Sequence, residues 1–183
     1  MNSGGQGQGQ APIFILKEGT SQTRGKTAQS NNIAAAAGVV TATLASADTA
    51  DLLNLTTAST DLIAVSVGDT PSIANLNTIA GKTGGVVTAT LAANSLSNLG
   101  ALTTAATDQI TVSVNDASAA ERDASDLSAL GGKTAGTVTV SNDINISGTT
   151  AEVKAALVDT STKVVATTAT VAISDNPSIT NLN

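Results

Sequence analysis

The stretch that decides the fold is Gly38-Val-Val-Thr-Ala-Thr-Leu-Ala45, which returns letter for letter at Gly85-Val-Val-Thr-Ala-Thr-Leu-Ala92. The offset is 47 residues, and the same offset carries Thr60–Val67 onto Thr107–Val114 with changes at only two positions. A period in this range is typical of arrays and solenoids, in which each repeat buries its apolar face against its neighbours. The repetition therefore predicts an architecture before it predicts any chemistry.

Six segments after Gly38 alternate apolar and polar residues with period two, which predicts strands. They begin near Val39, Leu62, Val86, Ile110, Thr137 and Val164. Between and after them lie apolar residues three or four apart, which predict helices of about two turns. These residues are Leu52/Leu55, Ile73/Leu76/Ile79, Leu96/Leu99/Leu102, Leu127/Leu130, Val153/Leu157 and Ile179/Leu182. The strand spacing of 23 to 27 residues places two strand–helix units in each 47-residue repeat.

Several residues mark where these helices begin and end. Pro71 and Pro177 are expected in first turns, and Thr149-Thr-Ala-Glu152 has the spelling of a capping box. Glycines at 81, 100, 131 and 132 are expected to end helices. Short strands joined through helices favour parallel pairing. Residues 38–183 are therefore predicted to form an α/β solenoid of about six strand–helix repeats, each of ~25 residues, with a parallel sheet. A β-helix or an array of all-β sandwich repeats is the alternative fold.

The composition restricts the chemistry. Apolar residues make up 41% of the chain, but Phe14 is its one aromatic residue, so the core must be thin and built from aliphatic side chains. The absence of Cys excludes disulfides and thiolate metal sites. The absence of His removes the usual general base and metal ligand. We therefore expect a protein that is not an enzyme and needs no cofactor.

Charge is divided unevenly along the chain. Residues 1–37 carry three basic side chains and Glu18, whereas residues 38–183 carry five basic and thirteen acidic ones. An acidic body repels phosphate backbones, so no nucleic-acid partner is expected. No run of eighteen apolar residues exists, which predicts no membrane span. The Gly/Gln-rich start lacks the apolar core of a signal peptide.

Residues 1–37 are expected to form a flexible arm with one strand. Residues 1–11 are rich in Gly and Gln, whereas Pro12-Ile-Phe-Ile-Leu16 is apolar and β-prone. A single strand on a tether is not stable alone. It is therefore predicted to dock, either on its own body or on a neighbour's sheet edge. The residues of this docking strand are Pro12, Ile13, Phe14, Ile15 and Leu16.

Gln10–Thr20, Arg24-Gly-Lys26 and Ala28–Ala36 together resemble the N-terminus of archaeal group II chaperonins, the thermosome family. In that family a long helix, a Gly-Pro-Lys-Gly nucleotide loop and a Gly-Asp-Gly-Thr-Thr loop follow, and none of them follows here. Gly68-Asp69-Thr70 lacks the second Gly and the Thr pair. The resemblance therefore implies a join between unrelated sequences at Ala37–Gly38 and carries over no ATPase site.

Residues 66–77 reappear at 172–183 with changes at five of twelve positions, at an offset of 106 residues, or about four units. The body, residues 38–183, resembles the tandem repeats of very large secreted bacterial, especially cyanobacterial, adhesin-like surface proteins. That resemblance implies an extracellular or cell-surface location. The repeat stops within a predicted helix, as an excised piece of a longer array would. An uncapped solenoid end favours self-association, and head-to-tail contacts of this kind build filaments.

Four aspartates each follow a predicted strand and could form a row in a solenoid: Asp69, Asp116, Asp143 and Asp175. Carboxylate oxygens suit Ca²⁺, so calcium is the one cofactor to consider. The alternative is that each Asp caps a helix or starts a turn. Capping is favoured because the chain has neither an Asp-x-Asp-x-Asp-Gly loop nor a Gly-Gly-x-Gly-x-Asp repeat.

Three other patterns have structural explanations. Glu121, Asp123 and Asp126 could suggest glycosidase chemistry, but the chain lacks the aromatic residues that line sugar clefts. Gly81-Lys82-Thr83 and Gly132-Lys133-Thr134 spell the end of a phosphate loop, but Leu stands where its first glycine is required, so turns after helices are predicted. Thr-rich strands could carry sugars or bind ice, but a strict Thr-x-Thr is not present in every unit.

From these patterns we expect a non-enzymatic structural or adhesive repeat protein that mediates spacing or self-association at a surface. One alternative is a chaperonin-derived fusion that docks through its N-terminal strand. Another is a calcium-dependent adhesion module.

Overall fold

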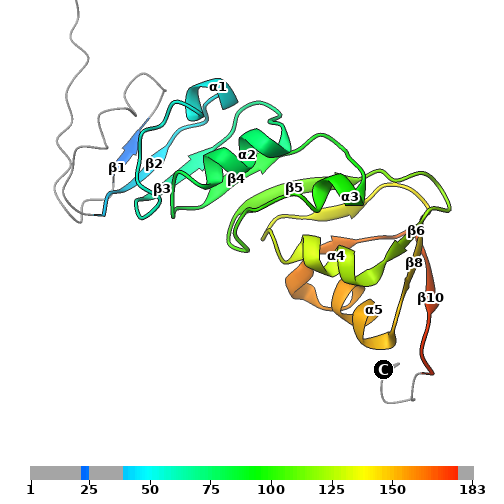
Figure 1. Ribbon diagram of the computed structural model, residues 1–183. Helices are drawn as coiled ribbons and strands as arrows, with labels where there is room; N and C mark the ends of the chain where they lie inside the picture. The colour runs from blue at the N-terminus through cyan, green and yellow to red at the C-terminus, as the bar shows by residue number, and fades with distance from the viewer. Residues whose placement is uncertain (1–21, 25–38, 177–183) are drawn as a thin grey trace, which may run out of the picture.

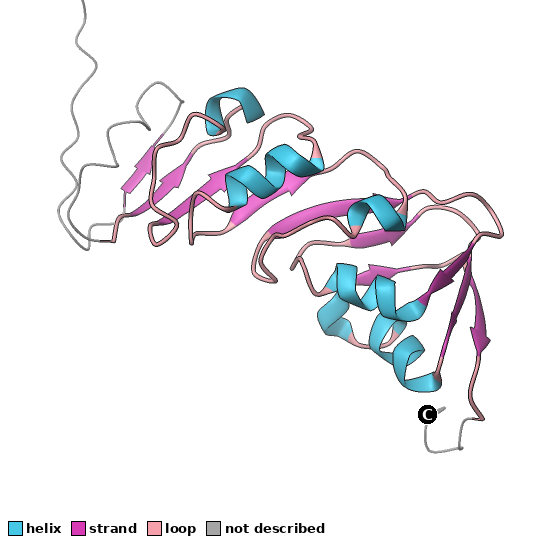
Figure 2. Cartoon of the chain, viewed as in Figure 1, coloured by secondary structure: helices cyan, strands magenta, loops and turns pink. Residues whose placement is uncertain are grey.

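The computed structural model describes residues 22–24 and 39–176 of the 183-residue chain, and these residues have an α/β fold. Parallel strands form the sheets, and short helices pack beside them (Figures 1 and 2). The strands are β1 (Gln22–Arg24), β2 (Thr41–Leu44), β3 (Leu62–Ser66), β4 (Val87–Thr90), β5 (Gln109–Val114), β6 (Glu121–Asp123), β7 (Val138–Val140), β8 (Asn145–Gly148), β9 (Val164–Val165) and β10 (Thr170–Ile173). The helices are α1 (Thr49–Leu52), α2 (Ile73–Ala80), α3 (Leu96–Leu99), α4 (Ala124–Gly131) and α5 (Thr150–Leu157), with a 3₁₀ turn, η2, at Thr160–Thr162.

Two parallel sheets organise the described residues. The first has seven strands in the order β1-β2-β3-β4-β5-β7-β9. Paired residues in it are 20 to 26 positions apart, from Gln22 against Ala42 to Val138 against Val164. The second sheet, β10-β8-β6, is parallel as well. Parallel neighbours require a crossover, and here the helices and their loops supply it. We call a strand of the first sheet, together with the four residues before it and the chain up to the next such segment, a unit.

The six predicted strands are all present, and each begins within two positions of the expected residue. Their parallel pairing is confirmed. Five helices lie between the strands, so the all-β alternatives are wrong. The apolar periodicity is therefore sufficient to predict the alternation of strand and helix.

The same periodicity does not predict β1, β6, β8 and β10. β6 reads Glu-Arg-Asp, and Ile146 is the single apolar side chain of β8, so neither strand alternates apolar and polar residues. β10 follows β9 after four residues and cannot be separated from it by pattern alone. The units that begin with β5, β7 and β9 thus contain an additional strand, and these additional strands form the second sheet.

The ends of the helices follow the predicted signals with one correction. Ser72 is the N-cap of α2 and its hydroxyl accepts a hydrogen bond from the Asn75 N–H, so Pro71 precedes the cap and is not in the first turn as expected. The capping box of Thr149 and Glu152 is confirmed at the start of α5. Gly81, Gly100 and Gly132 are the C-caps of α2, α3 and α4, as expected. The predicted helix at Ile179/Leu182 and the first-turn position of Pro177 lie outside the described residues.

The core is a thin aliphatic layer between the first sheet and the helices. Ile63 and Ile110 enter it from strands, and Leu76, Leu99 and Leu127 enter it from helices; all five are fully buried. Leu55 and Leu102, expected on helices, lie just past the short α1 and α3 and are buried all the same. The helices α4 and α5 also contact the second sheet (Figure 1). Each fully buried aliphatic side chain stabilises the fold by roughly 1.5–3 kcal/mol.

Successive units approach each other closely at two glycines that precede strands. A Cβ on Gly85 would lie 2.4 Å from the carbonyl carbon of Ile63, and a Cβ on Gly136 would lie 2.4 Å from the carbonyl oxygen of Ile110. Both glycines come two residues after a threonine and just before a strand. Any larger residue there pushes one unit away from the next.

We predict that Gly136→Ala destabilises the fold by about 2–3 kcal/mol, because the added Cβ meets backbone that cannot move without opening the sheet. Gly81→Ala is the matched control, since its Cβ would lie 3.4 Å from the nearest atom, the Asn77 carbonyl oxygen. The free energy of unfolding from urea titrations measures both. Equal midpoints for the two variants would contradict the close approach of the units.

Candidate functional site

Buried aspartates hold the beginnings of two strands. The Asp61 carboxylate accepts hydrogen bonds from the Val40 N–H, 21 residues back just before β2, and from the Ala58 N–H, both at 3.0 Å. The Asp108 carboxylate accepts in the same way from the N–H groups of Val87, the first residue of β4, and Ala105, both at 2.8 Å. Each carboxylate is at least 96% buried. Each therefore satisfies a backbone donor of the preceding unit that would otherwise be buried without a partner.

Threonines take the same place in the intervening units. The Thr83 hydroxyl accepts from the N–H groups of Ile63 and Gly85, both at 2.9 Å, and lies within 2.9 Å of the carbonyl oxygens of Asp61 and Ile63. The Thr134 hydroxyl repeats this arrangement one repeat later, with the N–H groups of Ile110 and Gly136. Together Asp61, Thr83, Asp108 and Thr134 form a buried ladder along the sheet, which we call the Asp/Thr ladder.

Sequence reasoning missed the Asp/Thr ladder, although a signal for it existed. The copies Thr60-Asp61 and Thr107-Asp108 place a charged residue directly before a strand that contains no other charge. Burying a carboxylate costs several kcal/mol unless it is hydrogen-bonded. When an aspartate recurs beside a strand in an internal repeat, a structural role as a hydrogen-bond acceptor is therefore the first interpretation, and a catalytic role is the second.

The Gly-Lys-Thr segments are turns, as predicted, and their lysines have a structural role. Lys82 Nζ donates to the Leu55 carbonyl oxygen just past α1, at 2.9 Å, and Lys133 Nζ donates to the Gly100 carbonyl oxygen at the end of α3. Thr57 and Thr104 donate back to the carbonyl oxygens of these lysines. A cation at the carbonyl end of a helix is favourable. The ammonium groups are thus held against the preceding unit.

The first and last calcium candidates cap helices. Asp69 accepts from the N–H and the hydroxyl of Thr49, the first residue of α1, at 2.9 and 2.5 Å. Asp175 accepts from the same two groups of Thr150, the first residue of α5, at 2.8 and 2.7 Å. The threonine hydroxyl and then the threonine N–H lower the pKa of each carboxyl below its usual value. Each helix belongs to the unit before the aspartate, so the caps connect units.

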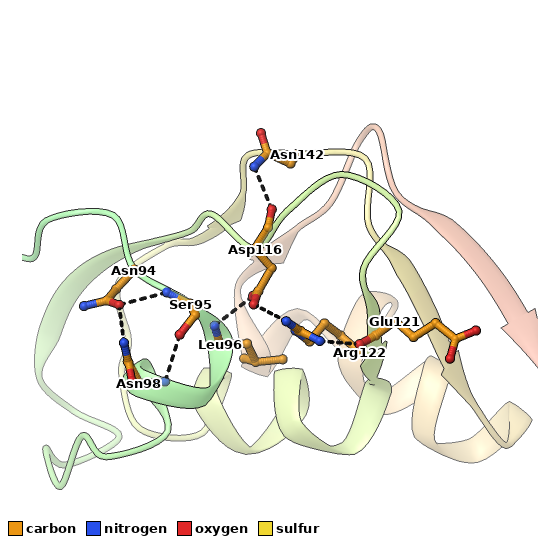
Figure 3. Close-up of polar contacts among 8 residues, drawn as sticks. All are labelled: Asn94, Ser95, Leu96, Asn98, Asp116, Glu121, Arg122 and Asn142. Carbon is orange, nitrogen blue, oxygen red and sulfur yellow. Dashed lines mark hydrogen bonds and ion pairs between the residues drawn. The ribbon is translucent and has the colours of Figure 1, made fainter.

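Asp116 is the most buried of the four candidates, and Figure 3 shows its contacts. One carboxylate oxygen accepts from the Leu96 N–H at the start of α3, at 2.8 Å, and the other accepts from Arg122 Nη2 at 2.5 Å. Burial raises the pKa of Asp116, but the hydrogen bonds from Arg122 and Leu96 and the charge of Arg122 together bring it below its usual value. The carboxylate is therefore ionised and fully occupied by the protein.

Asp143 lies apart from the other three. Its carbonyl oxygen accepts from the Ala119 N–H at 2.8 Å, in the loop between β7 and β8. The structure brings the four aspartates to separate helix starts and loops and does not place them on one ion. Within residues 22–24 and 39–176, no group of three or more His, Cys, Asp or Glu side chains is positioned to hold a metal ion.

A shallow groove of about 760 Å³ lies beside α3 and α4 and includes the carboxylate cluster considered for glycosidase chemistry. Glu121, Asp123 and Asp126 line it together with Arg122 and Lys133. Both cations are held by the structure, Arg122 on Asp116 and on the Glu121 carbonyl oxygen, Lys133 on a helix end. The groove therefore presents carboxylates beside two cations that already have partners, one an ion pair with Asp116 and one a backbone carbonyl oxygen, which is an ordinary polar surface.

No family model, curated protein or solved structure matches this chain. Among the helices that the structure describes, none is long and apolar enough to cross a membrane. The predicted docking strand Pro12–Leu16 lies outside the described residues. The strand that the structure does pair with β2 is Gln22–Arg24.

We predict that Asp108→Ala lowers the free energy of unfolding by roughly 2–5 kcal/mol, since it leaves the N–H groups of Val87 and Ala105 buried without acceptors. Asp126→Ala is the control, because Asp126 is exposed in the first turn of α4 and its loss costs only a few tenths of a kcal/mol, up to about 1. Chemical denaturation measures both. An equal loss in the two variants would show that the ladder does not stabilise the strands.

We predict that Asp116 stabilises the fold fully at pH values above its unfolded-state pKa of about 3.9 and that this stability is lost as the pH falls through its lower folded-state pKa. The difference in unfolding free energy between the native chain and Asp116→Asn should therefore shrink between pH 5 and pH 2 (roughly, around those pKa values). Arg122→Gln should raise the pKa of Asp116, measured by NMR titration of the carboxyl. A native pKa at or above the unfolded value would contradict the arrangement.

Proposed function

We propose that this chain is a non-enzymatic structural repeat protein whose units stack as a solenoid, and that it acts in spacing or self-association at a surface. The support is the direction of its polar contacts. Asp61, Asp69, Asp108 and Asp116, which we call the clamp aspartates, all reach back to the preceding unit. Side chains that could serve catalysis are thus used to join one unit to the next.

The observation that carries this proposal is that the clamp aspartates complete neighbouring units instead of forming a site. Asp61 and Asp69 lie on either side of β3, and Asp108 and Asp116 lie on either side of β5. One member of each pair holds the start of the preceding strand and the other holds the start of the preceding helix. A unit built in this way is completed by the next unit, which is the property that an extendable spacer needs.

Self-association and an extracellular or cell-surface location belong to this proposal. An array of parallel strands has open edges, and open edges pair with other chains unless they are covered. Two alternatives remain from the sequence. One is a chaperonin-derived fusion that docks through its N-terminal strand. The other is a calcium-dependent adhesion module, which the helix-capping role of Asp69, Asp116 and Asp175 disfavours.

The test is assembly as a function of concentration, with and without a chelator. We expect the molar mass from light scattering to rise with concentration and to be the same in EDTA and in millimolar Ca²⁺, because the clamp aspartates already have protein partners. Mass that rises only with Ca²⁺ would favour the calcium module. A monomer at every concentration would remove self-association from the proposed function and leave spacing.

A further inference from the structure

The last described unit leaves core-facing side chains uncovered. In β10, Val171 is in register with Ile146 of β8, which is fully buried, so Val171 lies on the inner face of the second sheet. Yet Val171 is 46% exposed and Ile173, two residues on, is 37% exposed. Side chains on a core face are exposed in this way where the next strand of the sheet is absent from the described residues.

The backbone of β10 is also open on this side. The N–H groups of Thr170 and Ser174 donate to Ile144 and Gly148, on the β8 side. Alternate residues of a parallel strand bond to opposite neighbours, so the N–H groups of Val171 and Ile173 point toward the free edge. Among the described strands, β10 is the last of its sheet. The edge therefore offers both backbone partners and two apolar side chains.

We propose that this edge binds the segment Pro12–Leu16 of a second copy of the chain, added as a parallel strand. The proposal rests on the self-association of the proposed function and names the two surfaces that meet. In a strand, Ile13 and Ile15 lie on one face and Phe14 and Leu16 on the other. Either pair has the two-residue spacing of Val171 and Ile173, so an apolar face meets the exposed pair whichever way the strand is turned.

The arm of the same chain is too short to reach this edge. Figure 1 shows β1 and β10 at opposite ends of the molecule. Six strand spacings separate β1 from β9, which lies in the same unit as β10, and an added strand lies one spacing further, about 34 Å in all. Leu16 and Gln22 are six residues apart, which spans at most about 21 Å when extended. Only another copy can place Pro12–Leu16 on the edge, and the resulting contact is head-to-tail.

The decisive experiment mixes two variants that each lack one surface. The donor-deficient variant lacks residues 1–16, and its control lacks only residues 1–9, which keeps Pro12–Leu16. The acceptor-deficient variant carries Val171→Asp and Ile173→Asp, and its control carries Val158→Asp, at a residue that is 66% exposed but lies at the end of α5. Both variants change exposed or terminal residues, and circular dichroism checks that each is folded.

We expect each deficient variant alone to associate roughly 100-fold more weakly than the native chain, since a lost strand or a buried unpaired carboxylate costs at least about 2.7 kcal/mol. The two controls should assemble as the native chain does. A mixture of the two deficient variants should form a 1:1 dimer and nothing larger, because only one donor and one acceptor remain. Assembly of either deficient variant at native strength, or no dimer in the mixture while the native chain assembles, overturns this proposal and leaves self-association standing.

Disulfide trapping gives an independent readout, because the chain has no cysteine of its own. Val171→Cys combined with Phe14→Cys or with Ile13→Cys should give a ladder of covalent oligomers on mild oxidation in one of the two combinations, because positions 13 and 14 lie on opposite faces of a strand. Val158→Cys combined with either should give far less. A monomeric native chain that assembles only when residues 177–183 are removed would show that the chain's own end covers the edge, which overturns the proposal. Failure of the native chain to associate in any form would instead remove the self-association of the proposed function.

Discussion

The architecture depends on one constraint, which is that each unit leaves backbone donors that the next unit must satisfy. At the start of β2 and β4 these donors are the N–H groups of Val40 and Val87, and carboxylates of the following unit accept from them. At the starts of α1 and α3 the donors belong to Thr49 and Leu96, and a second aspartate from the same following unit accepts from each. A buried donor without a partner costs about 1–3 kcal/mol. The stacking of units is therefore required by hydrogen bonding as well as by the thin aliphatic core.

The alternation of Asp and Thr explains why the sequence repeats every 47 residues although single units are about half that length. Strands β3 and β5 are each flanked by two aspartates, one before and one after the strand, eight positions apart. Both aspartates accept hydrogen bonds from the preceding unit. The units that follow use Thr83 and Thr134 instead. A threonine hydroxyl satisfies the strand donor without a charge. The repeat is thus a pair of units joined by two carboxylates, and threonines join one pair to the next.

Apolar periodicity predicts the first sheet and the helices because both depend on which side chains face the core. It predicts neither β6, whose three residues are all polar, nor the Asp/Thr ladder, because both depend on backbone donors that a sequence does not display. Asp69, Asp116 and Asp175 are recognisable as caps, but the helix that each one caps lies in the preceding unit. That assignment needs the register of the sheet, since Asp69 and Thr49 are 20 residues apart. The lack of aromatic residues argues against a glycosidase site at Glu121, Asp123 and Asp126, and in the structure the cations beside them already have partners.

The capping aspartates follow one positional rule, which holds where the units grow longer. A capped helix follows one strand, and its aspartate follows the strand paired with that one. Helix α1 follows β2, which pairs with β3, and Asp69 comes after β3. Helix α3 follows β4, which pairs with β5, and Asp116 comes after β5. In the longer units the strand leading into α5 is β8, and Asp175 accordingly follows its partner β10 in the second sheet. The similar segments 66–69 and 172–175 therefore serve the same contact although they end strands of different sheets. An additional strand can be inserted between the first strand of a unit and its helix without changing the hydrogen bond to the preceding unit. The capping aspartate must then follow the additional strand, as Asp175 follows β10. Width and stacking are thus independent in this fold, and an array can vary its surface from unit to unit while the contacts that hold it together stay the same.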